Sequence, residues 1–321
     1  MKDNYGREIN YLRISLTENC NLKCIYCLPE DFSPKLCEDD KVLSTEDVLK
    51  ITESGVELGI NKVRLTGGEP LLRKDIVEIV RGISLQGIKE IYLTTNGVLL
   101  AEKAKALKEA GLCGINVSLD TLDKELFKKI TRGGNLSKVL AGIEKAKEYG
   151  LKIKINGVII KGINDNSIKT LAELTKDNDI DVRFIELMPV GQGKKFIGIS
   201  NDEVYNILQN LFQFDEKYFE IKGVSKYYKL KNSMGKIGFI SPINSCFCDT
   251  CNKIRVMSDG SIKRCLNING HTNIKEYLDS GADKEIIKKI MKNEIFGKPE
   301  KHLFGKENDD EETKNMNQIG G

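Results

Sequence analysis

Cys20-Asn21-Leu22-Lys23-Cys24-Ile25-Tyr26-Cys27 is the stretch from which the rest of this 321-residue chain can be interpreted. Its three cysteines follow a C-x3-C-x2-C spacing, so one loop can present three thiolates to three irons of a four-iron cluster. The fourth iron would then have no protein ligand, and an open metal position can bind a small molecule. The spacing therefore predicts a cluster that takes part in chemistry rather than a closed, structural one.

Zinc is the first alternative for this loop, because C-x2-C pairs are common in zinc sites. Zinc normally takes four tight ligands, and both histidines of the chain, His271 and His302, are distant in sequence. Three buried cysteines without a metal are the second alternative, but Asn19, Asn21 and Lys23 make the loop polar. We therefore favour iron and sulfur.

The composition limits the classes of function. Lys and Arg total 50 against 47 for Asp and Glu, a net charge of +3 that gives no sign of a nucleic-acid partner. The nine cysteines, together with a polar and charged segment over residues 1–10, favour a reducing compartment over export. No run approaches the roughly 20 apolar residues of a membrane span. We expect a cytoplasmic protein that binds no membrane.

Strand-like and helix-like segments alternate after the cysteine loop, which is the pattern of parallel β/α units. Six strands are expected over residues 12–16, 62–66, 90–95, 114–119, 152–159 and 181–187. Amphipathic helices are expected over residues 45–58, 75–85, 101–110, 136–149 and 167–176.

Polar and apolar residues alternate within these strands, although parallel strands covered by helices usually read as continuous apolar runs. A period of two sends each set to one face. A set of edge strands facing solvent is the alternative, but a sheet has only two edges. The pattern favours an α/β fold with a partial, open (β/α)6 barrel and a wet interior, since a closed eight-stranded barrel packs its centre with apolar side chains. The polar set is Arg13, Ser15, Arg64, Thr66, Asn116, Ser118, Lys152, Lys154, Asn156 and Arg183.

Gly67-Gly68-Glu69-Pro70 follows the second expected strand, at the strand ends where α/β proteins bind ligands. Alone it is an ordinary turn. Together with the cysteine loop and Tyr26 it resembles the radical S-adenosylmethionine (SAM) superfamily, in which the open iron chelates SAM and one-electron reduction cleaves it. The resemblance implies that Gly68, Thr95, Ser118 and Met188 contact SAM, with Tyr26 near the adenine.

A second composition begins near residue 200, so we expect two regions, 1–199 and 200–321. The second region should contain a helix over residues 202–211 and short antiparallel strands over residues 218–230 and 236–240. It also carries a further cysteine triad, Cys248, Cys251 and Cys265, in a C-x2-C-x13-C spacing. Cys246 is a possible fourth ligand that would close this site and make it a candidate for zinc.

The second triad narrows the resemblance to the GTP 3′,8-cyclase family of molybdenum cofactor biosynthesis. Agreement extends over the whole chain. It includes Phe247, Asn252-Lys253-Ile254-Arg255-Val256, Leu12-Arg13-Ile14-Ser15-Leu16-Thr17, Asn116-Val117-Ser118-Leu119-Asp120, Lys161-Gly162-Ile163-Asn164-Asp165, Arg183-Phe184-Ile185-Glu186-Leu187-Met188-Pro189 and Gly320-Gly321.

This resemblance implies an activity and its cofactors. Cys20, Cys24 and Cys27 would hold one 4Fe-4S cluster, and the second triad would hold another whose spare iron binds the purine of GTP. The radical made from SAM would abstract hydrogen from C3′ of GTP, and addition to C8 would give 3′,8-cyclo-7,8-dihydro-GTP, the first step of molybdopterin biosynthesis. Implied partners are a one-electron reductant such as flavodoxin or ferredoxin and a cyclic pyranopterin monophosphate synthase that takes the product. The chain would be a monomer or homodimer.

The distribution of cations supports an anionic substrate independently of the resemblance. Six cations are expected in the interior without matching carboxylates, and a triphosphate would relieve their repulsion. The alternative is a set of ordinary solvated charges. Family members usually have Arg at the position of Lys253, so we expect weaker binding of phosphate by this residue. The six are Arg13, Arg64, Lys154, Arg183, Lys253 and Arg255.

The chain ends in Gly320-Gly321 after a charged segment. A frayed terminus is the ordinary interpretation. The resemblance instead implies that the two glycines enter the active site, where a carboxylate could meet Arg13, so that these three residues take part in catalysis.

Two other functions compete with the cyclase. A peptide-modifying radical SAM enzyme usually carries a longer cysteine-rich extension than this chain has. An iron-sulfur sensor or electron carrier would need neither the Gly-Gly-Glu-Pro segment nor a basic interior.

Overall fold

The computed structural model of the chain describes residues 1–33, 42–244, 247–268, 272–302 and 314–320. Cys246, His271 and Gly321 lie outside the described residues, so the expectations that involve them stay predictions. No helix within the described ranges is long and apolar enough to cross a membrane.

One twelve-stranded sheet forms the frame of the molecule, in the order β12-β11-β10-β1-β2-β3-β4-β5-β6-β9-β8-β7. Its central strands run parallel, each paired with the next in sequence. They confirm the six expected strands within two residues at each end. Their bounds are β1 Tyr11–Ser15, β2 Lys62–Thr66, β3 Glu90–Thr95, β4 Gly114–Ser118, β5 Lys152–Val158 and β6 Ile180–Ile185.

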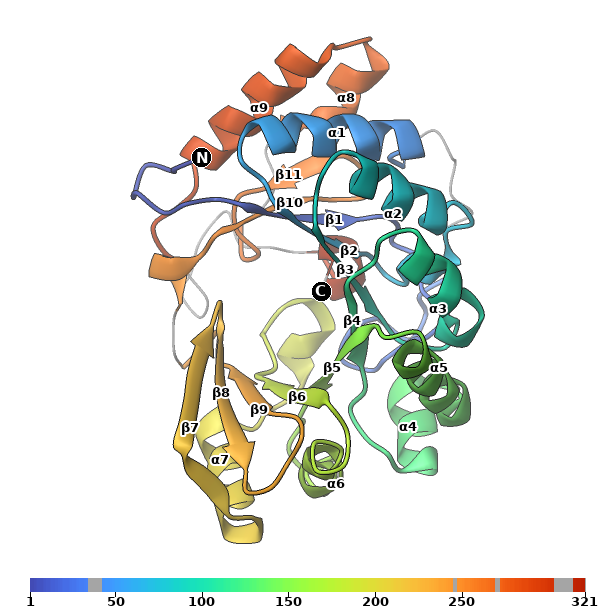
Figure 1. The fold of residues 1–321 in the computed structure, drawn as a ribbon, viewed down its shortest axis with the longest axis vertical. Coiled ribbons are helices and arrows are strands. Elements are labelled where there is room, and N and C mark those ends of the chain that lie inside the picture. The colour runs from blue at the N-terminus through green and yellow to red at the C-terminus, as the bar shows by residue number, and fades with distance from the viewer. Residues whose placement is uncertain (34–41, 245–246, 269–271, 303–313, 321) are drawn as a thin grey trace.

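The sheet curves into an arc with helices on its outer side and the C-terminal segment on its inner side (Figure 1). The outer helices are α1 Thr45–Glu57, α2 Ile76–Leu85, α3 Leu100–Glu109, α4 Lys124–Thr131, α5 Leu136–Glu148 and α6 Ser167–Glu173. Ser44 caps the start of α1 and forms a capping box with Asp47. Helix α4 was not predicted. It has 8 residues, and its N-cap is Asp123.

The C-terminal region extends both ends of the parallel sheet, which its sequence did not predict. Strand β9 (Ile237–Ile240) pairs parallel with β6, and β10 (Lys253–Val256) pairs parallel with β1. The expected antiparallel pairing is confirmed for β7 (Phe214–Lys222) with β8 (Ser225–Leu230) and for β8 with β9. The barrel therefore gains one parallel strand on each side of its six units and stays open.

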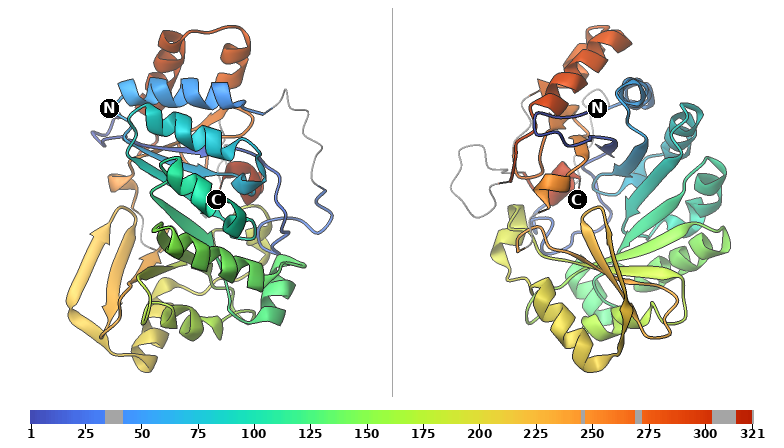
Figure 2. Two further views of the ribbon diagram at one scale, coloured as in Figure 1. Left: turned by 45° about the vertical axis from the view of Figure 1, so that its right-hand side comes forward. Right: turned by 60° about the vertical axis from the view of Figure 1, so that its left-hand side comes forward.

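Two C-terminal helices extend the outer layer at the two ends of the arc, α7 (Asn201–Leu211) beside α6 and α9 (Lys284–Phe296) beside α1 (Figure 2). Helix α7 matches the expected helix to within one residue. The remaining elements are β11 Ser261–Lys263, β12 Thr272–Asn273, α8 Ile274–Asp279, α10 Met316–Ile319 and the 3-10 turns η2 Pro70–Leu72, η3 Gly191–Lys195 and η4 Cys248–Thr250. The division into regions 1–199 and 200–321 stays a prediction.

The two faces of the parallel strands differ as the alternation predicted. The apolar set packs under the helices and is almost fully buried, for example Leu12, Ile14, Val63, Leu65 and Ile153. Each such aliphatic side chain contributes about 1.5–3 kcal/mol when buried. Because this face carries the core, the opposite face is free to be polar.

Candidate active site

The first cysteine loop rests on the end of α4. The backbone N–H groups of Lys23 and Ile25 donate to the carbonyls of Thr131 and Ile130, at 3.1 and 3.0 Å. Arg132 follows in the left-handed region, with φ 52°, and its Nη1 donates to the carbonyl of Leu28 at 2.9 Å. The carbonyls that a helix end leaves unsatisfied thus fix the shape of the loop.

Gly68 lies directly beneath the same loop. A Cβ at this position would lie 2.3 Å from the Asn19 carbonyl oxygen and 2.6 Å from that of Glu18, so no larger residue fits. The N–H groups of Gly68 and Glu69 donate to the carbonyls of Thr17 and Asn19, both at 2.7 Å. Close packing of two backbones, rather than a turn alone, therefore requires the glycine.

The donor chemistry of the first triad fits an iron-sulfur cluster. The three cysteines are free thiols. Burial raises the pKa of Cys20 to about 11 and that of Cys27 to about 12. Burial also raises the pKa of Cys24 well above its usual value, and Cys27 and Cys20 add to the effect because their sulfurs are close. Three neighbouring half-buried thiolates need a positive centre, which iron supplies.

The residues expected around SAM differ in what their side chains offer. Ser118 is exposed at the end of β4 and Met188 is half-buried after β6. The Tyr26 hydroxyl donates to Asp120 Oδ2 at 2.7 Å. The Thr95 hydroxyl donates to Glu69 Oε1 at 2.7 Å and accepts from the Gly97 N–H at 3.0 Å, so its one donor is already used and a ligand could bond to its remaining lone pair or to its backbone.

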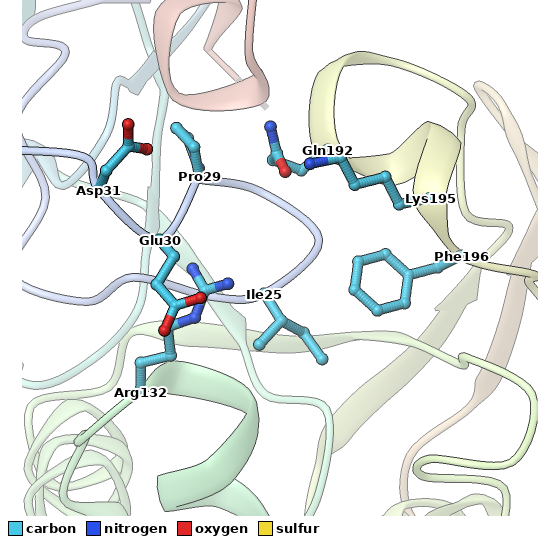
Figure 3. Close-up of a pocket in the computed structure, with 8 residues that line it drawn as sticks. All are labelled: Ile25, Pro29, Glu30, Asp31, Arg132, Gln192, Lys195 and Phe196. Carbon is cyan, nitrogen blue, oxygen red and sulfur yellow. The ribbon is translucent and has the colours of Figure 1, made fainter.

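A cavity of about 510 Å³ opens beside the cysteine loop. Figure 3 shows Ile25 on one side of it and Gln192, Lys195 and Phe196 on the other. Gln192 and Lys195 belong to η3, which follows β6, and Phe196 comes directly after it. The first cysteine site is therefore bordered by a solvent-connected space of mixed charge.

The second cysteine triad lies at the opposite end of the barrel. Cys251 precedes β10 by two residues, and β10 runs parallel to β1, whose far end leads into the first cysteine loop. Strand β11 runs antiparallel to β10, so Cys265, just past its end, lies at the same end as Cys251. Strand β1 has four residue steps of roughly 3.3 Å, so about 13 Å of strand separates the two sites.

The second triad has a different electrostatic environment from the first. Burial alone would raise the pKa of Cys251, but Lys298 and Lys253 outweigh it and lower that pKa. Arg255 also lies near both Cys251 and Cys265. The thiolate form of Cys251 is thus favoured relative to an ordinary cysteine, and the donor set fits a second cluster.

No three His, Cys, Asp or Glu side chains within the described residues gather closely enough to hold one metal ion. A four-iron cluster makes a different demand, because each thiolate binds a separate iron. Within the described part of the chain, the zinc alternative therefore gains no support.

Between the two triads, the interior face carries a row of cations in register. Arg255, Arg13 and Arg64 are partners across β10, β1 and β2, and Lys253 is the partner of Tyr11. Burial lowers the pKa of Arg13 well below its usual value, and Arg255 adds to the effect. Such a desolvated group of like charges is stabilised by an anion.

The expectation that no carboxylate matches the interior cations is wrong at Lys154. Its Nζ pairs with Asp181 Oδ2 at 2.5 Å and contacts the Tyr227 hydroxyl at 3.1 Å. Asp181 is the β6 register partner of Lys154, a pairing that strand alternation alone did not reveal. Arg183 lies two residues after Asp181 on β6, and its Nε donates to Asn156 Oδ1 at 2.9 Å.

The C-terminal segment enters the barrel, as the resemblance implied. The Gly320 carbonyl accepts from Arg13 Nη2 at 3.3 Å and from Arg255 Nη1 at 3.2 Å. Ile319 is fully buried against Val190 and Met257. The tail therefore reaches the row of cations.

Several site residues were not predicted. Lys263 is the β11 partner of Arg255 and extends the row of cations. Tyr11 accepts from Arg64 Nε at 2.5 Å. Asn317 Nδ2 donates to the Glu18 carbonyl at 2.9 Å and ties the tail to the first cysteine loop. Tyr11 fits the alternation with Arg13 and could have been found, whereas the other two depend on tertiary pairing.

Comparisons with known proteins agree with this geometry. Residues 14–175 match the family model described as Radical SAM superfamily, and residues 180–304 match the model described as Molybdenum Cofactor Synthesis C.

Relatives of similar length share the whole chain. The GTP 3′,8-cyclase of Clostridium perfringens (strain 13 / Type A) is 46% identical over 100% of both chains. That of Alkaliphilus oremlandii is 45% identical over 100% of both, and that of Listeria monocytogenes is 44% identical over 100% of this chain and 99% of its own.

Solved structures show the same fold. Streptococcus suis SuiB bound to S-adenosylmethionine has a TM-score of 0.62 at 19% identity, covering 88% of this chain and 68% of SuiB. Native anSMEcpe with bound AdoMet has a TM-score of 0.54 at 18% identity, covering 90% of this chain and 81% of its own.

Proposed function

Because the chain belongs to the GTP 3′,8-cyclase family of radical SAM enzymes, we propose that it converts GTP to 3′,8-cyclo-7,8-dihydro-GTP with two 4Fe-4S clusters. The observation that carries the proposal is the register of β10, β1 and β2, which aligns Arg255, Arg13 and Arg64 between the two cysteine triads. A nucleoside triphosphate matches such an interior, since its phosphates neutralise the cations.

Each triad would hold one cluster. Cys20, Cys24 and Cys27 would bind the cluster that supplies the electron for SAM cleavage. Cys248, Cys251 and Cys265 would bind the second, at the purine end of GTP. Gly68, Ser118, Met188 and Tyr26 would contact SAM, together with Thr95.

The chain's own residues would position the triphosphate. Arg64 is fixed by its hydrogen bonds to Tyr11 and Thr94, at 2.5 and 3.4 Å, so its remaining donors are oriented before the ligand arrives. Lys253, Arg255 and Arg183 would bind further phosphate oxygens. Lys154 would bind a phosphate oxygen only after releasing Asp181. Its contribution to GTP binding should therefore be the smallest among these cations.

The tail would act next to the reacting nucleoside. Gly320 is already bound by Arg13 and Arg255. Deleting Gly320 and Gly321 should preserve both clusters and SAM cleavage but stop cyclisation, and a free peptide ending in Gly-Gly should restore part of it. Full cyclase activity after the deletion would contradict this role.

The proposed setting is the cytoplasm, where a flavodoxin- or ferredoxin-like reductant supplies the electron and a cyclic pyranopterin monophosphate synthase takes the product. The free thiols of the described cysteines are consistent with a reducing compartment.

Two single substitutions test the division between the clusters. Cys24→Ala should abolish SAM cleavage, whereas Cys251→Ala should leave some uncoupled 5′-deoxyadenosine formation but no cyclised nucleotide. Both products are measured in one chromatogram after incubation of reduced protein with SAM and GTP. Equal loss of both products in both folded variants would contradict the two-site function. Cys113→Ala, far from either triad, is the matched control and should change neither.

A further inference from the structure

The short segment after α9, residues 297–300, contacts both pieces of chain that carry the second triad. Lys298 is 4% exposed. Its Nζ donates to the Lys253 carbonyl at 2.8 Å and to the Arg264 carbonyl at 2.5 Å. Lys253 lies two residues after Cys251, and Arg264 directly precedes Cys265. One buried ammonium group therefore joins the two cysteine-bearing segments.

The N-terminal segment reaches the same place from the other side, next to the end of α9 (Figure 1). Arg7 Nη1 donates to the carbonyls of Cys248 and Glu300, both at 2.9 Å. Arg7 Nη2 donates to the Pro299 carbonyl at 2.7 Å. The first cysteine of the triad is thereby fastened to the segment that holds the other two.

Arg7 is itself held rigidly. Its Nε donates to Asp3 Oδ2 at 2.6 Å, and Asp3 Oδ1 accepts the backbone N–H groups of Tyr5 and Arg7 at 2.9 and 3.0 Å. Both side chains of the pair are buried, at 7% exposure for Arg7 and 0% for Asp3. A buried ion pair with most donors satisfied has little left for a substrate, but it fixes whatever carbonyls it binds.

We propose that Arg7 and Lys298 are positioning residues that hold Cys248, Cys251 and Cys265 at the spacing of the second cluster by fastening all three to residues 297–300. The inference rests on the proposed second cluster. The β10–β11 pairing brings the ends of the stretch between Cys251 and Cys265 together, and Lys298 fixes the backbone of both ends beyond the last register pair of that hairpin. Lys298 also places a positive charge beside Cys251 and Cys265.

Iron content tests the anchoring role. Reconstituted wild-type protein should hold about eight irons per chain, from two four-iron clusters. The iron content of Arg7→Ala should fall to about four per chain. Only the electron paramagnetic resonance signal of the second cluster should be lost. SAM cleavage, which depends on the first triad, should persist and shows that the variant folds. Arg7→Lys should recover part of the iron, because one donor to the carbonyls remains.

Arg73 provides a matched control. It also pairs with a nearby carboxylate, Asp75, and donates to two backbone carbonyls, those of Leu16 and Leu43. Arg73→Ala should lower the melting temperature by an amount comparable to Arg7→Ala and still retain the second cluster. If Arg73→Ala loses the second cluster to the same extent, the effect of Arg7 is general destabilisation and the inference fails.

The reduction potential of the second cluster tests the role of the Lys298 charge, because it does not respond to packing alone. Lys298→Met removes the charge and both hydrogen bonds but keeps a chain of similar length, so it should lose part of the second cluster, and the reduction potential of the clusters that remain should fall, since a nearby cation favours the reduced form. Lys298→Arg should restore the potential. An unchanged potential in Lys298→Met, or eight irons in both Arg7→Ala and Lys298→Met, would overturn the inference. Four irons in the wild type would instead contradict the proposed second cluster.

Discussion

Replacement of Gly320 by Ala tests whether the docked tail is needed for cyclisation. Gly320 has φ +65°, in the left-handed region. A Cβ there would lie 2.9 Å from Thr66 Cγ2 and 3.2 Å from Ser15 Cβ. The new methyl group would therefore meet the interior face of β1 and β2 in a backbone conformation that alanine disfavours.

The size of the effect follows from two terms. A non-glycine residue in the left-handed region costs about 1–2 kcal/mol. Overpacking by one methyl group costs about 1–3 kcal/mol. The sum of about 2–5 kcal/mol is comparable to the two hydrogen bonds that Arg13 and Arg255 donate to Gly320, at about 1.5–3 kcal/mol each. Docking of the tail should weaken by about thirtyfold to several thousandfold, at tenfold per 1.4 kcal/mol.

The assay measures cyclised nucleotide and 5′-deoxyadenosine together. Gly320→Ala should reduce cyclisation at least about tenfold while SAM cleavage continues. Adding Thr66→Ser removes the methyl group that the new Cβ would meet, so the double variant should recover part of the activity, with Thr66→Ser alone as the control. Cyclisation at the wild-type rate in Gly320→Ala would refute the reasoning.

Three further predictions follow from the site. Arg64→Ala should weaken GTP binding by about 1.5–3 kcal/mol and leave SAM binding unchanged in calorimetric titrations, because Arg64 faces the proposed triphosphate; an unchanged GTP affinity would remove Arg64 from the phosphate site. Burial raises the pKa of Tyr11, but Arg64 and Arg13 outweigh it and lower the pKa to about 8. In metal-free protein, inorganic triphosphate should raise this pKa, since an anion opposes the tyrosinate, and Tyr11→Phe should abolish the step in absorbance at 295 nm; a step that persists would belong to another tyrosine. Cys246→Ser should leave iron near eight per chain, by the two-cluster count, whereas loss of about half would make Cys246 a ligand.

The sequence by itself determined the six central strands of the barrel and supplied most of the candidate site residues. The six parallel strands were predicted because polar and apolar residues must alternate along any strand whose two faces have different surroundings. Both cysteine triads and Arg13, Arg64 and Arg255 were found because their chemistry needs these residue types in short or alternating spacing. Helix α4 was missed although the cysteine loop rests on it, since eight residues carry little periodic signal.

Only the tertiary structure decided which distant segments meet. The sequence of β10 does not state that it pairs with β1, yet that pairing aligns Arg255 with Arg13 and creates the row of cations. The register of β5 and β6 likewise gives Lys154 its partner Asp181. The fold also brings Arg7 and Lys298 to the second triad, although Arg7 and Cys248 are 241 residues apart in the chain. The physical reason is that local sequence sets which face a side chain takes, whereas strand order and long-range packing set what that face meets.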